Sequence, residues 1–151
     1  RISKTVTYDI FGPIYNQAYW NECKMVIDKL QPNIQVNYKG SIASEKVPAL
    51  LQEYHFFIMP SEGENFGHSI LEGLTAGCPV IISDNTPWRK LKEKQIGWDV
   101  PLDSEEIISA LEEALVMDQN TYDRWSYNAW RFAREVIIDP EVMEANKKLF
   151  N

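Results

Sequence analysis

The sequence predicts an α/β fold in which a parallel sheet carries helices on both faces. Short runs rich in β-branched and aromatic residues alternate along the chain with stretches of helical periodicity. Residues 55–59 are almost entirely apolar, which is typical of a strand covered on both faces. Strict alternation without an internal repeat or linker favours a parallel sheet wrapped by helices.

The first half of the chain predicts two strands and two helices. Residues 5–11 form a strand that ends at a Gly-Pro pair. Asn16 is a good N-cap for a helix whose apolar face runs to Leu30. Residues 34–38 form the second strand, and residues 44–54 have helical spacing.

The second half continues the alternation. Three further strands are predicted at residues 55–59, 80–82 and 97–100, with helices near 68–76 and 87–94 between them.

Three helices are predicted after the last strand. Asp103 and Glu106 make a capping pair for the first, whose apolar face includes Leu111 and runs to Leu115. The second spans residues 121–136, and a short third begins at residue 141.

Composition limits the function. The 151 residues predict a single domain over 1–151, and 15 basic against 22 acidic residues give a net charge of −7. This acidity argues against nucleic-acid partners, which require clustered Lys and Arg.

Cys23 and Cys78 lack companions for a disulfide framework or zinc site, so we expect buried, reduced thiols and a cytoplasmic protein.

The ends of the sequence indicate a piece of a longer protein. There is no apolar run of the roughly 18 residues that a membrane span requires, and no signal peptide. Because the chain also lacks an initiator Met, we expect it to be part of a longer protein.

The loop over residues 60–67 is the candidate site. In open parallel sheets, ligands bind at the carboxyl ends of strands, in loops that lead into helix N-termini. Here the loop follows an apolar strand, contains Gly63 and Gly67, and opens a helix. Backbone N–H groups and the positive end of the helix dipole together favour a phosphate at such a position.

Two glutamates flank this phosphate position. Glu64 precedes the helix, whereas Glu72 lies inside it, about 7 Å along the axis at about 1.5 Å per residue. A carboxylate that accepts two vicinal hydroxyls is a known ribose ligand in such folds, so Glu72 suits a ribose and Glu64 a sugar beyond a diphosphate. A favourable charge–dipole contact for Glu64 and a solvated position for Glu72 are the alternatives, and His68 is either a phosphate donor or an ordinary helix residue.

The chain resembles retaining glycosyltransferases of the group 1 family, over residues 5–136. The family's pattern is a Glu, an aromatic-Gly pair, a second Glu eight positions after the first, and a Gly-x-Pro-Val step into a strand. This sequence matches it with Pro60-Ser61, Glu64-Asn65-Phe66-Gly67, Glu72, and Ala76-Gly77-Cys78-Pro79-Val80-Ile81-Ile82-Ser83-Asp84. The resemblance implies the C-terminal half of a GT-B fold, which is a Rossmann-like donor-binding domain.

The resemblance also implies residue roles. Glu64 matches the catalytic Glu that contacts the transferred sugar, and Glu72 the Glu that binds the nucleotide ribose. The turn that contacts the sugar and diphosphate matches Asn65, Phe66, Gly67, His68 and Ser69. Ile42 and Ser44 match the family residues that contact the nucleotide base, although Ser44 also suits a plain helix N-cap.

The implied reaction transfers a hexose from a nucleotide-diphosphate sugar to an acceptor hydroxyl with retention, in polysaccharide or glycoconjugate biosynthesis. No Asp-x-Asp occurs, so no metal or other cofactor is expected. The family's acceptor-binding N-terminal domain and its diphosphate-clamping Arg/Lys pair are not identifiable here, and Arg1 and Lys4 are too close to the first strand for that role. We expect the acceptor sugar, lipid or glycan, and any peripheral contact with the inner face of the membrane, to involve that other domain.

Other functions remain open at this stage. A sugar-nucleotide epimerase or phosphorylase-like enzyme uses the same scaffold, and a non-catalytic module would use the acidic surface to bind a protein. A dinucleotide oxidoreductase is disfavoured, because the first strand is followed by a single Gly instead of Gly-x-Gly-x-x-Gly.

Overall fold

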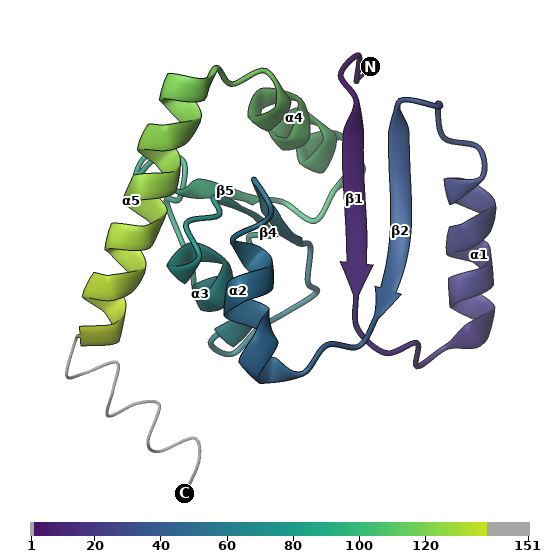
Figure 1. The fold of residues 1–151 in the computed structure, drawn as a ribbon, viewed down its shortest axis with the longest axis horizontal. Helices are drawn as coiled ribbons and strands as arrows, with labels where there is room; N and C mark the ends of the chain where they lie inside the picture. The colour runs from purple at the N-terminus through teal and green to yellow at the C-terminus, as the bar shows by residue number, and fades with distance from the viewer. Residues whose placement is uncertain (1, 139–151) are drawn as a thin grey trace, which may run out of the picture. The chain divides into compact units, whose positions relative to one another are not determined.

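The computed structural model describes residues 2–138, which fall into two compact units that divide between Lys46 and Val47. Figure 1 shows the elements of both units in chain order. The predicted short helix from residue 141 lies outside the described residues. The single domain over 1–151 stays a prediction.

The first unit contains a parallel strand pair joined by a helix. Strand β1 (Val6–Phe11) pairs with β2 (Ile34–Gly40), with Val6 opposite Ile34, and α1 (Gln17–Ile27) connects them. Asn16 is the N-cap of α1 as predicted, since its side chain accepts a hydrogen bond from the Tyr19 N–H at 3.0 Å. The helix ends at Ile27, before Leu30, and a short 3₁₀ turn (Ser44–Lys46) follows β2.

The second unit contains a three-stranded parallel sheet in the order β3-β4-β5. Its strands are β3 (Phe57–Met59), β4 (Val80–Ser83) and β5 (Gly97–Val100). Its helices are α2 (Val47–Leu51), α3 (His68–Thr75), α4 (Ser104–Leu115) and α5 (Gln119–Ile138).

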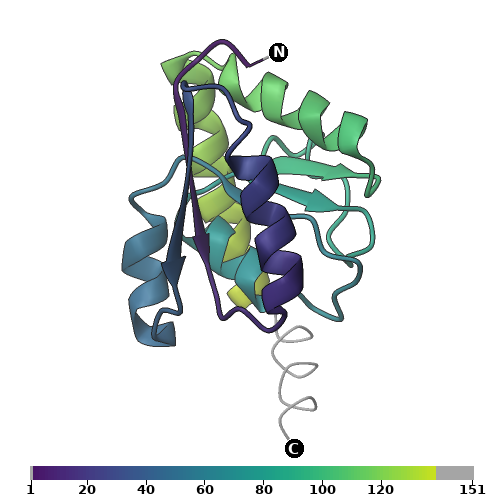
Figure 2. The ribbon, with the colours of Figure 1, turned by 90° about the vertical axis from the view of Figure 1, so that its right-hand side faces the viewer.

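Helices cover both faces of this sheet. Alternate residues of β4 enter different core clusters: Val80 and Ile82 pack with residues of α3 and α5, and Ile81 packs with residues of α4. Figure 2 shows α3 (teal) and α4 (green) on opposite sides of the strands. Helix α5 contributes to both clusters, through Trp125 to one and Ala129 to the other. The fold-class prediction is confirmed.

Helix α3 ends in a glycine C-cap. The Gly77 N–H donates to the Leu74 carbonyl and the Cys78 N–H to the Gly73 carbonyl, each at 3.0 Å, which is a Schellman C-cap with Gly77 at φ 80°. The position of Gly73 is set by packing, because an added Cβ there would lie 3.0 Å from the Phe57 ring.

Three local predictions were wrong. Residues 87–94 form no helix, because the Asp99 carboxylate of β5 accepts the N–H groups of Lys90 and Leu91, and Lys90 has φ 60°. Strand β3 begins at Phe57 instead of residue 55, because Pro79, just before its partner Val80, has no N–H to extend the ladder. Asp103 caps α4, but its own N–H donates to the Pro101 carbonyl at 2.7 Å, so Glu106 does not complete a capping box.

Candidate functional site

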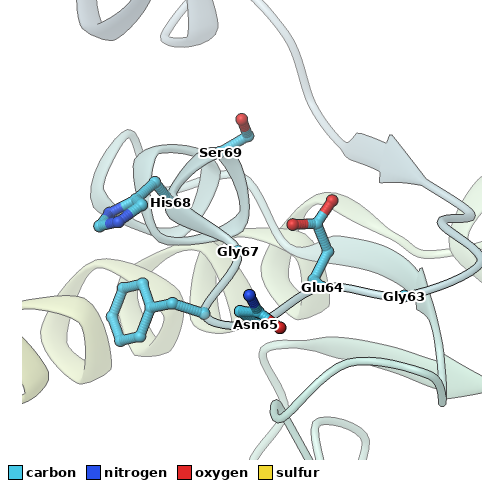
Figure 3. A pocket seen from close by; sticks show the side chains of 7 residues that line it. Gly63, Glu64, Asn65, Gly67, His68 and Ser69 are labelled. Carbon is cyan, nitrogen blue, oxygen red and sulfur yellow. The ribbon is translucent and has the colours of Figure 1, made fainter. Parts of the chain in front are cut away.

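The predicted loop forms an open depression at the carboxyl end of β3. The depression has a volume of about 550 Å³ and lies where β3 leads into α3 (Figure 3). Seven consecutive residues line it: Gly63, Glu64, Asn65, Phe66, Gly67, His68 and Ser69. Five of the predicted donor-contacting residues and the predicted catalytic Glu64 are therefore brought together by the structure.

Gly67 makes the turn from the loop into α3. It is the N-cap residue in the left-handed conformation, with φ 80° and ψ 60°, and it is buried. Its carbonyl accepts the N–H groups of Ile70 at 3.0 Å and Leu71 at 3.2 Å, which starts the helix. The amide of Ser69 therefore has no carbonyl of its own helix to bind, and it lies at the positive end of the dipole.

The side chains of His68 and Glu64 point to different sides of the turn. Figure 3 shows the Glu64 carboxylate on the side toward which Ser69 projects, whereas the His68 ring lies at the far end of the turn. The rings of Phe66 and His68 lie 4.8 Å apart between centroids.

Glu64 is the only Asp or Glu among the lining residues, which include no Lys or Arg. Anion binding in the depression would therefore depend on backbone amides and neutral side chains.

Glu64 is held at its backbone and at its carboxylate. Its N–H donates to the Asn85 carbonyl at 3.3 Å, and the Ser61 hydroxyl lies 3.3 Å from its Oε1. The same hydroxyl lies 2.9 Å from the Gly63 carbonyl. These contacts leave Glu64 half-buried in the wall of the depression.

The last residue of β4 and the segment that follows it bind this loop at three places. The Ser83 hydroxyl donates to the Ser61 carbonyl, the Asn85 carbonyl accepts from Glu64, and the Trp88 indole N–H donates to the Phe66 carbonyl. The carboxyl ends of the neighbouring strands β3 and β4 are thus joined by these three hydrogen bonds, at the edge of a parallel sheet where ligand sites are expected.

The other predicted residues lie elsewhere. Glu72 is half-buried in the middle of α3, and it is not among the residues that line the depression. Ile42 and Ser44 belong to the first unit, so the structure does not relate them to the loop. Ser44 opens the 3₁₀ turn, whose first hydrogen bond joins the Lys46 N–H to the Ala43 carbonyl at 2.9 Å.

Cys78, in the Gly-Cys-Pro-Val step, has a structural environment. It is buried, and its thiol donates to the carbonyls of Leu51 at 3.0 Å and Tyr54 at 3.1 Å. Burial raises the pKa of this thiol to about 11, so it is not a nucleophile near neutral pH. The prediction that Cys78 is a buried thiol is confirmed, whereas Cys23 is only half-buried.

Sequence reasoning gave no role to Ser61, Asn85 or Trp88. Ser61 and Asn85 hold the loop through hydrogen bonds with Gly63 and Glu64, which the sequence pattern does not indicate. Trp88 carried a signal, because a buried indole N–H requires an acceptor. The sequence alone did not separate core from interface tryptophans, whereas in the structure Trp88, Trp98 and Trp125 are buried and Trp130 is exposed.

The described part of the chain contains neither a membrane-crossing helix nor a cluster of metal-ligand side chains. Within residues 2–138, no helix has the length and apolarity that crossing a membrane requires. In the same residues, no three His, Cys, Asp or Glu side chains are grouped as metal ligands.

The chain matches the model of one known protein family. The family model described as "Glycosyl transferases group 1" matches residues 4–132. No curated protein is significantly similar to the chain in sequence.

Three solved structures share the fold. WaaG, a glycosyltransferase involved in lipopolysaccharide biosynthesis, superposes with a TM-score of 0.65 at 18% identity, over 83% of this chain and 33% of that one. A GtfA/B complex gives 0.61 at 20% identity, over 86% of this chain and 26% of that one. The pneumococcal O-GlcNAc transferase GtfA in complex with UDP and GlcNAc also gives 0.61 at 20%, over 95% and 29%. This chain thus spans about a third or less of each of these three structures.

Proposed function

Because the chain belongs to the group 1 glycosyltransferase family, we propose that it is the donor-binding domain of a retaining hexosyltransferase. The donor is a nucleotide-diphosphate sugar and the acceptor is a hydroxyl of a sugar, lipid or glycan, in polysaccharide or glycoconjugate biosynthesis. The observation that carries the proposal is the loop between β3 and α3, where Glu64 and the start of α3 share one depression. The acceptor-binding domain lies outside this chain in the proposed enzyme.

The proposed residue roles follow the loop. Amides at the start of α3 bind the diphosphate, and Glu64 contacts the transferred sugar that lies beyond the diphosphate. Glu72 binds the ribose from α3. The remaining donor contacts are Asn65, Phe66, Gly67, His68 and Ser69 around the phosphates, with Ile42 and Ser44 at the base.

The chemistry requires mainly electrostatic help. The bond between the anomeric carbon and the diphosphate oxygen breaks with its electron pair moving to the oxygen, through an oxocarbenium-like state. Amides that point at the departing oxygens stabilise the growing charge. The acceptor oxygen then bonds to the anomeric carbon on the same face, and the leaving phosphate takes the acceptor proton. The proposal therefore needs no protein base and no metal.

The proposed location is the cytoplasm, where nucleotide sugars serve as donors, with any contact at the inner face of the membrane made outside this chain.

Adding EDTA should leave the turnover of the enzyme unchanged, and a loss that Mg²⁺ restores would refute the metal-free proposal.

Nucleotide titration tests donor binding. The ¹⁵N-labelled chain is titrated with UDP, GDP, ADP and CMP, and then with the glucose derivative of whichever diphosphate binds. We expect amide shifts over residues 64–72. If saturating nucleotide moves no amide in this range, the chain is not a donor-binding domain.

A matched pair of substitutions tests Glu64. In the enzyme that contains this chain, Glu64→Gln keeps the size of the side chain and removes its charge, so turnover should fall by about 10²-fold or more, the usual effect of losing one transition-state contact. Glu62→Gln is the control, because Glu62 lies on the same loop and is exposed. Equal turnover of the two variants would remove Glu64 from catalysis.

A further inference from the structure

We propose that Trp88 is a positioning residue of the donor site. Its indole orients the peptide group between Phe66 and Gly67, so that the Gly67 N–H points toward the donor diphosphate. The inference rests on the proposed function and adds a residue from the segment after β4, which neither the family pattern nor the loop itself contains.

The anchor is a partly buried hydrogen bond between residues 22 positions apart. The Trp88 indole N–H donates to the Phe66 carbonyl. Trp88 is only 8% exposed, and its ring meets the Phe66 ring edge-on at 5.6 Å between centroids. The backbone N–H of Trp88 is itself bound to the Thr86 hydroxyl at 3.3 Å, and the ring of Phe132 of α5 lies 6.1 Å from the indole between centroids. The indole is therefore fixed by the core.

The planarity of the peptide group carries this fixation to the site. No described peptide bond is cis, so the Phe66 carbonyl and the Gly67 N–H point in opposite directions across one plane. With the carbonyl fixed on the indole, the Gly67 N–H must point away from Trp88. Gly67 lines the depression, so its N–H adds a donor at the opening of α3.

The other side of Gly67 is fixed as well. The Gly67 carbonyl accepts the N–H groups of Ile70 and Leu71, so this carbonyl is committed to the helix. Both peptide groups that flank the Gly67 Cα are therefore held, one by Trp88 and one by α3. Glycine tolerates many conformations, and removing the indole bond would release the 66–67 peptide to rotate.

Trp98 provides a matched control. It is also a buried tryptophan, 2% exposed, and its indole N–H donates to Glu113 Oε2 at 3.0 Å. It lies in the core cluster on the α4 side of the sheet, whereas Trp88 lies in the cluster with α3. A Trp98→Phe variant therefore loses a comparable ring and a comparable hydrogen bond without touching the loop.

The experiment compares diphosphate and nucleoside binding in three variants of the full chain. Trp88→Phe, Trp98→Phe and a Trp88→benzothienylalanine variant, which keeps the bicyclic ring and removes only the N–H, are each titrated by NMR. The probes are the nucleoside diphosphate that the wild type binds and the matching nucleoside. Circular dichroism verifies that each variant is folded.

We expect both Trp88 variants to bind the diphosphate about tenfold or more weakly, the effect of one lost hydrogen bond to a charged group, with nucleoside binding unchanged. Trp98→Phe should bind both probes as the wild type does. Unchanged diphosphate binding by the benzothienylalanine variant would overturn the inference, and so would equal weakening of both probes, which indicates a purely structural role. If the wild type itself binds no nucleotide, the proposed function fails instead.

Discussion

Replacing Gly67 by alanine should damage the donor site through a clash that the structure defines. Gly67 has φ 80°, and an added Cβ would lie 2.8 Å from Ile70 Cδ1 and 3.1 Å from Trp88 Nε1. The first contact is with the end of a flexible side chain. The second is with the indole that holds the Phe66 carbonyl, which has no room to move without breaking that bond.

The expected cost is about 2–4 kcal/mol. A left-handed conformation costs a non-glycine residue about 1–2 kcal/mol. Displacing Ile70 from its rotamer adds about 0.5–1.5 kcal/mol. Moving Trp88 adds about 1 kcal/mol for its weakened hydrogen bond. The smaller conformational entropy of alanine in the unfolded chain offsets about 0.4–1 kcal/mol of this.

Gly77→Ala is the matched control. Gly77 has the same φ of 80°, but an added Cβ would meet only Ser126, at 3.0 Å from its rotatable hydroxyl. This variant should therefore lose only the conformational part, and after the same entropic offset its net loss should be about 1 kcal/mol. Comparison of the two variants separates the effect of backbone strain from the effect of crowding Trp88.

Urea unfolding and nucleotide titration are the two assays. Gly67→Ala should lower the free energy of unfolding by more than Gly77→Ala does, and it alone should lose nucleotide binding. The reasoning is refuted if both variants lose the same stability, because the contacts with Ile70 and Trp88 would then carry no cost. It is also refuted if Gly67→Ala binds nucleotide normally.

Three further predictions concern residues outside the loop. In the folded protein a thiol reagent at pH 8 should modify Cys23 and spare Cys78, because the pKa of Cys78 is raised to about 11 by burial. Mass spectrometry identifies which cysteine is modified. Rapid modification of Cys78 would contradict the prediction. Asp103→Ala should lower the free energy of unfolding by about 1 kcal/mol, because the carboxylate caps α4 through two N–H groups, whereas Asp103→Asn should retain most of it; equal unfolding midpoints in urea would argue against the cap. The hydrogen bond from Lys92 lowers the pKa of Glu113, so the stability that this carboxylate contributes is present above its ordinary pKa and is lost as the pH falls through the lowered value. The stability difference between the wild type and Glu113→Gln should accordingly shrink on acidification below about pH 4.5, the ordinary value, and a difference that is independent of pH would disprove the link.

The site could be predicted from the sequence as far as it is local. The loop between an apolar strand and a helix, with glycines and two glutamates at fixed spacing, placed six residues that line the depression. Glu72 was predicted as a donor ligand from its place on the helix, and its role stays a prediction. Ile42 and Ser44 also stay predictions, since they belong to the other unit.

The failed helix over residues 87–94 shows what local patterns lack. Its spacing is helical, but the carboxylate of Asp99 on β5 binds the N–H groups of Lys90 and Leu91 and fixes a different backbone. That hydrogen bond depends on a strand that comes later in the chain. Periodicity describes residues within one or two turns of each other and carries no information on such a partner.

The sequence by itself determined the alternation of strands and helices, the N-caps at Asn16 and Asp103, and the position of the candidate loop. Each of these depends on residues close together in the chain, for which spacing and side-chain chemistry are sufficient. Only the tertiary structure decided how the loop is held, because Ser83 and Trp88 reach the loop residues across 22 residues of sequence. Those two hydrogen bonds exist only after β3 and β4 pair and bring their carboxyl ends together.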